Sequence, residues 1–215
     1  MSRRRLVSSL AAGALLAGSA LGLAPAASAA GHPTGTTSLA SVLLADGDTF
    51  DHNWYDYDIV TQAVLAVIDA KGGDTPVALL ADGTVPLTAF IPNDRAFQVL
   101  VHDLTKKWVR SEAKVFEAVA GLGIDTVEQV LLYHVVPGAT IDSATALKSD
   151  NARLTTAQGG TFKVDVLSKR AAIVRLIDND RNDINPFLNR RALDINEGNV
   201  QIAHGITFVL RPFDL

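Results

Sequence analysis

The stretch LTAFIPNDRAF, residues 87–97, predicts a β-strand that leads directly into an α-helix. Its first residues alternate between two sides, as the residues of a strand do, with Leu87, Ala89 and Ile91 on one side and Thr88 and Phe90 on the other. Pro92 has no backbone N–H and cannot continue the ladder of hydrogen bonds. Asn93 or Asp94 then stands where a side-chain oxygen caps a helix.

Helical patterns surround this strand. Apolar residues recur every three to four positions in five segments, which is the period of an amphipathic helix. These segments are residues 38–45, 57–73, 94–108, 111–123 and 126–136.

Details within these segments predict helix ends. Trp108 completes the apolar stripe of the helix over residues 94–108, whose last turn carries two lysines. Thr126 and Gln129 have the spacing of a capping box, in which two side chains satisfy each other's free amides. Pro137 and Gly138 end this last helix, so Tyr133 and His134 are expected in its final turn.

The character of the chain changes after residue 138. Short β-branched segments separated by turns predict strands, at residues 138–147, 151–158, 161–168, 170–177 and 199–213. The Gly159–Gly160 pair joins two of them into a hairpin. Asp178 to Asn199 is a polar insertion. Because helices come first and strands last, the expected fold class is α+β.

The first residues have the form of a secretory signal peptide. Arg3 to Arg5 precede an apolar centre and the small residues before Ala29. We therefore expect a signal peptide at residues 1–29, a flexible leader at residues 30–37 and one domain at residues 38–215, in a protein secreted to the extracellular space. No second stretch is apolar enough for stable membrane insertion after signal removal.

Charge and cysteine content exclude several classes of protein. Without residues 1–29 the chain has 16 basic against 23 acidic residues, a net charge near −7, which does not favour binding to nucleic acid. The chain has no cysteine, so disulfides, thiolate metal sites and a cysteine nucleophile are excluded. No cofactor motif is present, and we expect no cofactor.

Three stretches taken together identify a family. LTAFIPNDRAF at residues 87–97, LLYHVVPG at residues 131–138 and IAHGITFVLRPFDL at residues 202–215 occur in the order that is typical of a fasciclin domain. The tract TTAQGGTFKVDV, residues 155–166, adds to the resemblance. The resemblance covers residues 38–215.

This resemblance implies a wedge of two packed β-sheets flanked by an N-terminal group of helices. It also implies an extracellular adhesion or interaction module that is not an enzyme, with an extracellular protein or polysaccharide as partner. The Tyr-His motif, here Tyr133 and His134, is implicated in partner binding in animal members. We expect the partner-binding face around Tyr133, His134, Asn199, Val200 and the polar insertion at Asp178 to Asn199. Asn199 and Val200 stand where integrin-binding members often have Asp-Ile, which argues against an integrin as the partner.

Two candidate sites, the Tyr-His pair and a possible calcium loop, each have an alternative interpretation as part of the packing or of a turn. Apolar neighbours surround Tyr133 and His134, so the pair could simply be part of the packing. Asp178, Asp180 and Asn182 begin like a calcium-binding loop, but Asp183 replaces the glycine of the sixth position and Asn189 the glutamate of the twelfth. A turn held by Asp and Asn side chains is the alternative there.

A second functional hypothesis is a glycan- or small-molecule-binding protein, or a polymer hydrolase. Trp54, Tyr55 and Tyr57 lie among Asp51, Asp56 and Asp58, a mixture of rings and carboxylates that suits carbohydrate, although such a cluster can also pack its loop onto the domain. A cavity lined by this region and by the insertion would favour this hypothesis. Other polar groups are isolated or too short to predict a site, namely His32, His52, His102, His204, Lys106–Lys107 and Arg190–Arg191.

Overall fold

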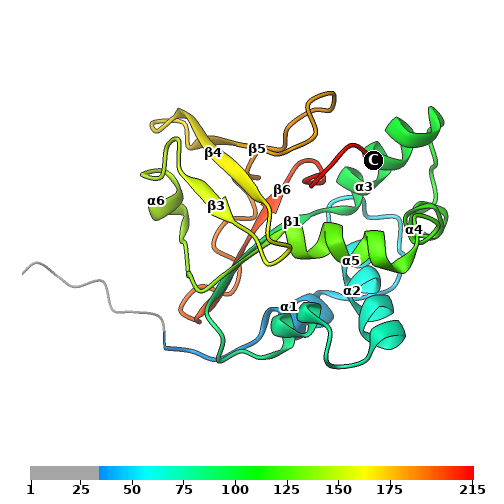
Figure 1. The fold of residues 1–215 in the computed structure, drawn as a ribbon, viewed down its shortest axis with the longest axis horizontal. Coiled ribbons are helices and arrows are strands. Elements are labelled where there is room, and N and C mark those ends of the chain that lie inside the picture. Colours follow the sequence, from blue (N-terminus) through cyan, green and yellow to red (C-terminus); the bar gives the residue numbers. More distant parts are fainter. Residues whose placement is uncertain (1–33) are drawn as a thin grey trace, which may run out of the picture. The chain divides into compact units, whose positions relative to one another are not determined.

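The computed structural model describes residues 34–215. The expected signal peptide, and residues 30–33 of the expected leader, lie outside the described residues. Most helices precede most strands, which confirms the α+β class (Figure 1). The elements are α1 (Leu39–Asp46), α2 (Asp58–Lys71), the 3-10 helix η1 (Pro76–Ala81), β1 (Leu87–Pro92), α3 (Asp94–Thr105), α4 (Glu112–Ala120), α5 (Ile124–Tyr133), β2 (Val135–Pro137), α6 (Ser143–Ala146), β3 (Arg153–Thr155), β4 (Thr161–Ser168), β5 (Ile173–Ile177) and β6 (Gln201–Ile206).

The strand-to-helix stretch at residues 87–97 forms as predicted. β1 ends at Pro92, and the Asn93 side chain accepts a hydrogen bond from the Ala96 amide at 3.0 Å to cap α3. The helix ends at Thr105, three residues earlier than expected, because Lys106 adopts a left-handed conformation with φ of 58°. Trp108 therefore lies beyond the helix, where its ring stacks on His102 with centroids 4.0 Å apart.

Further local expectations are wrong. The helix expected over residues 126–136 ends at Tyr133, and Val135 to Pro137 form the strand β2 instead. α5 begins at Ile124, after Gly123 with a φ of 88°, and no side chain caps it, so Thr126 and Gln129 lie inside the helix instead of forming a capping box. The segment 138–147 is not a strand. Asp142 accepts a hydrogen bond from the Thr145 amide at 2.7 Å and so starts the short helix α6.

Two three-stranded sheets form in the described residues. In the first, of order β2-β1-β6, β1 is central and pairs antiparallel with β2 and parallel with β6. The second is an antiparallel meander of order β3-β4-β5, in which the Gly159–Gly160 turn joins β3 to β4 as predicted. β1 is buried on both faces, because the helices cover one face and the second sheet covers the other.

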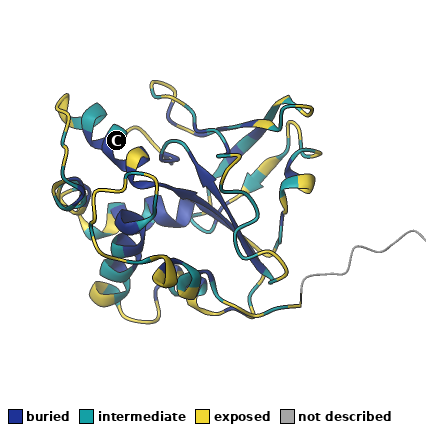
Figure 2. Ribbon diagram, turned by 180° about the vertical axis from the view of Figure 1, so that it is seen from behind, coloured by how far each residue is buried: buried dark blue, intermediate teal, exposed yellow. Residues whose placement is uncertain are grey.

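These two faces define two cores (Figure 2). The helix-side core packs α1 to α5 against Leu87, Ala89 and Ile91 of β1. The inter-sheet core places Phe90 of β1 against residues of β4 and β5, and its largest members are Phe90, Tyr133, Phe162, Leu176, Ile206 and Leu210. The residues of β1 that alternate in the sequence thus point into two different cores, one on each face of the strand.

The polar insertion between β5 and β6 is largely part of the fold. The Leu176 amide donates to Pro186 O at 2.8 Å, and the Leu188 amide donates to Val174 O at 3.0 Å. On its other side the Thr207 amide donates to Phe187 O at 3.0 Å. The segment 186–189 therefore runs between β5 and β6 and connects the two sheets.

The first described residues are held by the turn before β6. The Gly35 amide donates to Gly198 O at 3.0 Å, and the Val200 amide donates to Gly35 O at 2.9 Å. The Thr37 amide donates to the side-chain oxygen of Asn199 at 2.9 Å. This amino-terminal segment, residues 34–38, also packs against Gly83, where an added Cβ would overlap the carbonyl oxygen of Thr36.

Among residues 34–215, none of the helices has both the length and the apolar composition that crossing a bilayer requires.

Candidate functional site

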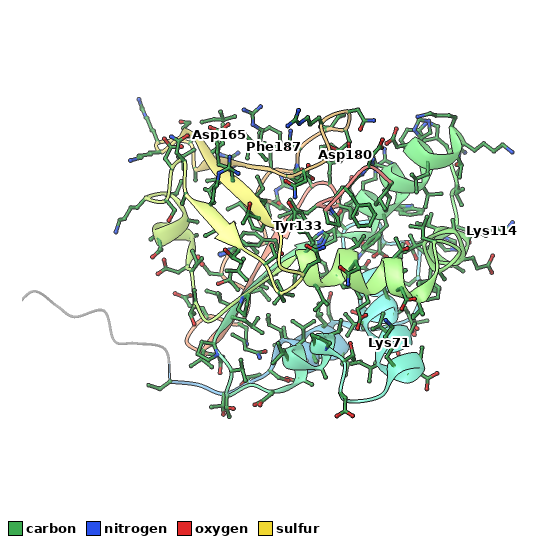
Figure 3. The ribbon with its side chains drawn as sticks, in the orientation of Figure 1. Lys71, Lys114, Tyr133, Asp165, Asp180 and Phe187 are labelled. Atoms are coloured by element: carbon green, nitrogen blue, oxygen red, sulfur yellow. The ribbon has the colours of Figure 1, made fainter. Side chains whose placement is uncertain are left out.

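Tyr133 lies at the end of α5 with no exposed surface. Its hydroxyl donates to Thr161 O at 2.8 Å, and its ring meets Phe162 edge-on with centroids 6.1 Å apart. Figure 3 shows it between α5 and the β3–β4 hairpin. Burial raises the pKa of its hydroxyl above the ordinary value. Tyr133 therefore fastens the hairpin to α5 and offers no surface to a partner.

His134, which is 5% exposed, joins three parts of the chain. The Leu210 amide donates to Nε2 at 2.9 Å, so Nε2 carries no proton, and Nδ1–H donates to Val130 O at 2.7 Å. Its own carbonyl accepts from the Phe90 amide at 2.9 Å. Burial lowers the pKa of the imidazole to about 4, so the ring is neutral at pH 7.

Asn199 and Val200 do not join Tyr133 and His134 in one site. Val200 O accepts from the Leu87 amide at 3.3 Å, whereas His134 O accepts from Phe90. These two partners are three residues apart on β1, which corresponds to roughly 10 Å along a strand. Both Asn199 and Val200 serve to hold the amino-terminal segment, and both are partly exposed.

Arg211 lies beside the calcium candidate, where its guanidinium pairs with Asp180 and with two further aspartates. Arg211 approaches Asp180 at 3.3 Å, Asp183 at 3.0 Å and Asp103 at 2.9 Å, while its amide donates to Asp178 at 2.9 Å. Burial raises the pKa of Asp178 to about 7.

Side chains also hold the turn itself. Asp178 accepts from the Asp180 amide at 3.2 Å, and Asp180 accepts from the Asn182 amide at 3.2 Å. These bonds form the turn held by Asp side chains that the sequence gives as the alternative to a calcium loop. The Arg211 guanidinium supplies the positive charge next to Asp180 that a calcium ion would otherwise supply.

The three rings of the aromatic loop between α1 and α2 differ in their burial. Trp54 and Tyr57 pack against the helix-side core, and Trp54 O accepts from the Arg95 amide at 2.9 Å. Tyr55 points outward and is 77% exposed. Two rings thus hold the loop to the domain, and one is free for contact.

Tyr55 borders a surface cleft of about 740 Å³. One wall comes from Tyr55, Asn93 and Arg95, at the start of α3, and the other from the β4–β5 turn, the insertion and the residue after β6. The second wall contributes Arg170, Ala171, Ala172, Leu188, Asn189, Arg190, Arg191 and Thr207.

Four arginines line this cleft, and none of them forms an ion pair among residues 34–215. Arg190 donates to Ala171 O at 2.9 Å, which places its guanidinium across the β4–β5 turn. Arg95 lies over the Trp108 ring at 5.0 Å from its centroid. Arg170 and Arg191 are exposed. A chain with a net charge of −4 thus has a basic cleft.

Comparison with known proteins shows the family and the fold. The family model named Fasciclin domain matches residues 61–209, well over half of the chain. The chain belongs to the fasciclin domain family. No curated protein matches the chain.

A solved structure shows the same fold. It is a FAS1 domain pair from the insect cell adhesion molecule Fasciclin I, with a TM-score of 0.53 and 17% sequence identity. The match covers 81% of this chain and 51% of that one, so this chain spans about half of its length. Fasciclin domains are in general interaction modules of the extracellular space.

The arginine cleft was missed by the sequence analysis. Arg190–Arg191 is too short a pair to indicate a patch, and the arginines that complete it, Arg95 and Arg170, are 20 to 95 residues away in the chain. The sequence offers one signal for a binding site here, which is Tyr55 in a polar loop among Asp residues. The structure shows that this ring is exposed and is therefore free to contact a ligand.

Proposed function

We propose that this protein is a secreted adhesion or interaction module of the fasciclin type, and that it binds an acidic polysaccharide in the arginine cleft. Binding is its whole activity in this proposal, with no catalytic step. The observation that carries the proposal is the set of four arginines without carboxylate partners in one cleft of an acidic protein.

The chemistry of the lining supports a polyanion. Guanidinium groups bind carboxylate or sulfate through two parallel hydrogen bonds, which gives both strength and orientation. The exposed ring of Tyr55 at the edge of the cleft can pack against the apolar face of a sugar. An open cleft also suits a chain that continues past it in both directions.

The cleft connects the two hypotheses drawn from the sequence. It is lined by the aromatic loop through Tyr55 and by the insertion through Leu188 to Arg191, which is the cavity that a glycan-binding protein would require. Hydrolysis needs two carboxylates about 5 to 9.5 Å apart on either side of the bond. The residues that line this cleft include neither Asp nor Glu, and this favours binding over cleavage.

Tyr133 and His134 have an indirect part in this proposal. They hold the β3–β4 hairpin and the segment after β6 in place, while Arg190 and Arg191 of the insertion make the contact. The insertion itself should not be deleted in a test, because residues 186–189 connect the two sheets and their removal would disrupt the fold.

Charge-removing variants test the cleft. We expect the double variant Arg170→Gln/Arg191→Gln to bind an immobilised polyuronate at least about tenfold more weakly than the unchanged protein, since each arginine would contribute a charge-assisted contact. Biolayer interferometry at two salt concentrations measures this, and affinity should fall as salt screens the contact.

Lys107→Gln/Lys114→Gln is the matched control, because it also removes two positive charges. Both lysines are exposed and neither lines the cleft, and Figure 3 shows Lys114 at the edge of the structure. Equal binding of the double variant and this control would contradict the proposal. So would equal binding to a neutral glucan, or release of reducing ends from the polymer.

A further inference from the structure

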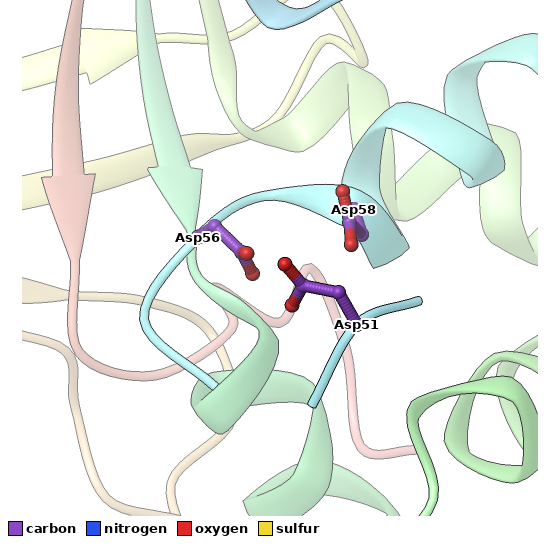
Figure 4. A group of neighbouring side chains, drawn as sticks. All are labelled: Asp51, Asp56 and Asp58. Carbon is purple, nitrogen blue, oxygen red and sulfur yellow. The ribbon is translucent and has the colours of Figure 1, made fainter. Parts of the chain in front are cut away.

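Three helices begin at one point, and each begins with an acid. Asp58 is the first residue of α2, Asp94 of α3 and Glu112 of α4. Single carboxylate oxygens of these three residues all lie within 4.8 Å of one another. Asp51 and Asp56 of the aromatic loop extend the group, and Figure 4 shows their carboxylates and that of Asp58 directed toward one another.

The acid cluster is defined as Asp51, Asp56, Asp58, Asp94 and Glu112, and its buried members have carboxylate oxygens without a hydrogen-bond partner. Asp58, Asp94 and Glu112 are 5%, 0% and 1% exposed. Each has one buried oxygen without a hydrogen bond, namely Asp58 Oδ2, Asp94 Oδ2 and Glu112 Oε1, and Asp56 Oδ1 is a fourth. A buried carboxylate oxygen without a donor is costly, so something is expected to satisfy these atoms.

Backbone groups satisfy only part of the cluster. The Ile59 amide donates to Asp94 Oδ1 at 3.0 Å, and the His52 amide donates to Glu112 Oε2 at 2.8 Å. Each helix start contributes roughly half a positive charge. Three of them therefore offset about one and a half of the five carboxylate charges, and no Lys or Arg of the described residues forms an ion pair with any of the five.

We propose that the acid cluster is a calcium site that joins the aromatic loop to the starts of α2, α3 and α4. Calcium binds six to eight oxygens at about 2.3 to 2.6 Å, so opposite ligands lie roughly 4.6 to 5.2 Å apart. The cluster consists of two groups of three that share Asp58, and within each group one oxygen per residue lies within 4.8 Å of the others, which fits this range. The unpartnered oxygens are the atoms that would face the ion.

The donor set selects the metal. All five side chains offer hard carboxylate oxygens, with neither nitrogen nor sulfur among them, which excludes a preference for zinc or copper. Magnesium keeps several waters and demands octahedral geometry, whereas calcium accepts a crowded cage of protein oxygens. Asp51 is exposed, so a hydrated ion can enter from that side.

Calorimetry on the full chain tests the site. After treatment with EDTA and removal of the chelator, titration with CaCl₂ should give saturable heat for one ion, and MgCl₂ should bind at least about tenfold more weakly. Terbium bound in the same place should be displaced by calcium, which provides a second signal. Calcium should also raise the melting temperature of the protein.

Charge-neutral variants locate the ion. Asp58→Asn and Glu112→Gln keep the shape of the side chain and should each weaken calcium binding at least about tenfold, because each removes a ligand charge. The rise in melting temperature on adding calcium should shrink with them. This difference between calcium-loaded and calcium-free protein does not depend on how each variant alters the basal stability.

Two controls separate this site from other acids. Asp125→Asn removes an exposed carboxylate that pairs with Lys71 on the surface, and Asp180→Asn removes the central acid of the calcium candidate at residues 178–182. Both should keep the heat of calcium binding. Absence of saturable heat at millimolar calcium in the unchanged protein, or its retention in both cluster variants, would overturn the proposal.

Discussion

At the scale of single residues, His134 shows how burial determines a role. Both ring nitrogens have fixed partners, a backbone carbonyl at Nδ1 and a backbone amide at Nε2. A proton on Nε2 would oppose the Leu210 amide and would have to be buried without an acceptor. The residue that a sequence motif marks as a contact is thus a neutral connector between α5, β1 and the segment after β6.

This arrangement predicts a dependence of stability on acid. In the unfolded chain His134 binds a proton below pH 6.5, but in the folded protein its pKa is about 4. The free energy of unfolding should therefore fall as the pH decreases from 6.5 toward 4, by roughly 2 to 3 kcal/mol from this group.

Urea unfolding at pH 7 and pH 4.5 measures the effect, and the loss should be smaller in His134→Gln. The difference between the two proteins isolates His134 from the buried acids, whose raised pKa values act in the opposite direction. An NMR titration of the wild-type ring gives the pKa directly. A midpoint near 6.5 would contradict the assignment.

At the scale of elements, close backbone contacts hold the amino-terminal segment to the domain. Gly83, between η1 and β1, leaves room for the Thr36 carbonyl, and Gly35 leaves room for the Asn199 side chain. The segment is therefore fixed by the absence of two side chains as well as by its hydrogen bonds to the turn before β6.

Gly83→Ala should destabilise the protein by about 1 to 3 kcal/mol, because the new methyl group would overlap the Thr36 carbonyl. Gly73→Ala is the control, since an added Cβ there meets nothing within 4 Å. Thermal unfolding compares the two variants. If both melt at the same temperature, the contact at Gly83 does not hold the segment.

Most elements could be predicted from the sequence, because their signals are local. The apolar period of α2, the proline that ends β1 and the glycines of the β3–β4 turn each act within a few residues. The errors also have local causes. Gly123 starts α5 before the Thr126–Gln129 pair, and the Asp142 cap makes a helix of a β-branched segment.

The candidate sites could be predicted only in part, because they are assembled from distant segments. The acid cluster combines Asp94 and Glu112 with three aspartates of the aromatic region, and the sequence indicated only those three aspartates as part of a possible binding site. Nothing in the sequence around Glu112 indicates that α4 begins beside α2 and α3. The burial of Tyr133 and His134 likewise depends on β4 and on the segment after β6, which no local pattern places beside them.

At the scale of the whole described structure, β1 belongs to both cores. Its two faces carry Leu87, Ala89 and Ile91 into the helix-side core and Phe90 into the inter-sheet core. Neither core can lose its packing without exposing one face of the same strand. We therefore expect residues 34–215 to unfold in one cooperative transition.

Leu176→Ala tests this cooperativity. Leu176 is 1% exposed in the inter-sheet core, and its truncation should cost about 2 to 5 kcal/mol. Both tryptophans lie on the helical side, so their fluorescence should shift to a lower urea midpoint together with the far-UV circular dichroism signal. An unchanged tryptophan midpoint would show that the two cores unfold independently.

The parallel pairing of β1 with β6 also has a consequence for how the protein is made. On the ribosome β1 is synthesised before β6, and the two strands cannot pair until residues 93–200 and β6 itself have been made. β2 can pair with one edge of β1 once residue 137 has been made, but the other edge stays unpaired until β6 follows, and the nascent chain stays accessible to chaperones until then. If residues 1–29 direct export by a translocon that accepts only extended chains, this delay helps the polypeptide to remain unfolded until it is exported. A twin-arginine signal, which the arginines at residues 3–5 also fit, would instead require β6 to pair with β1 before export.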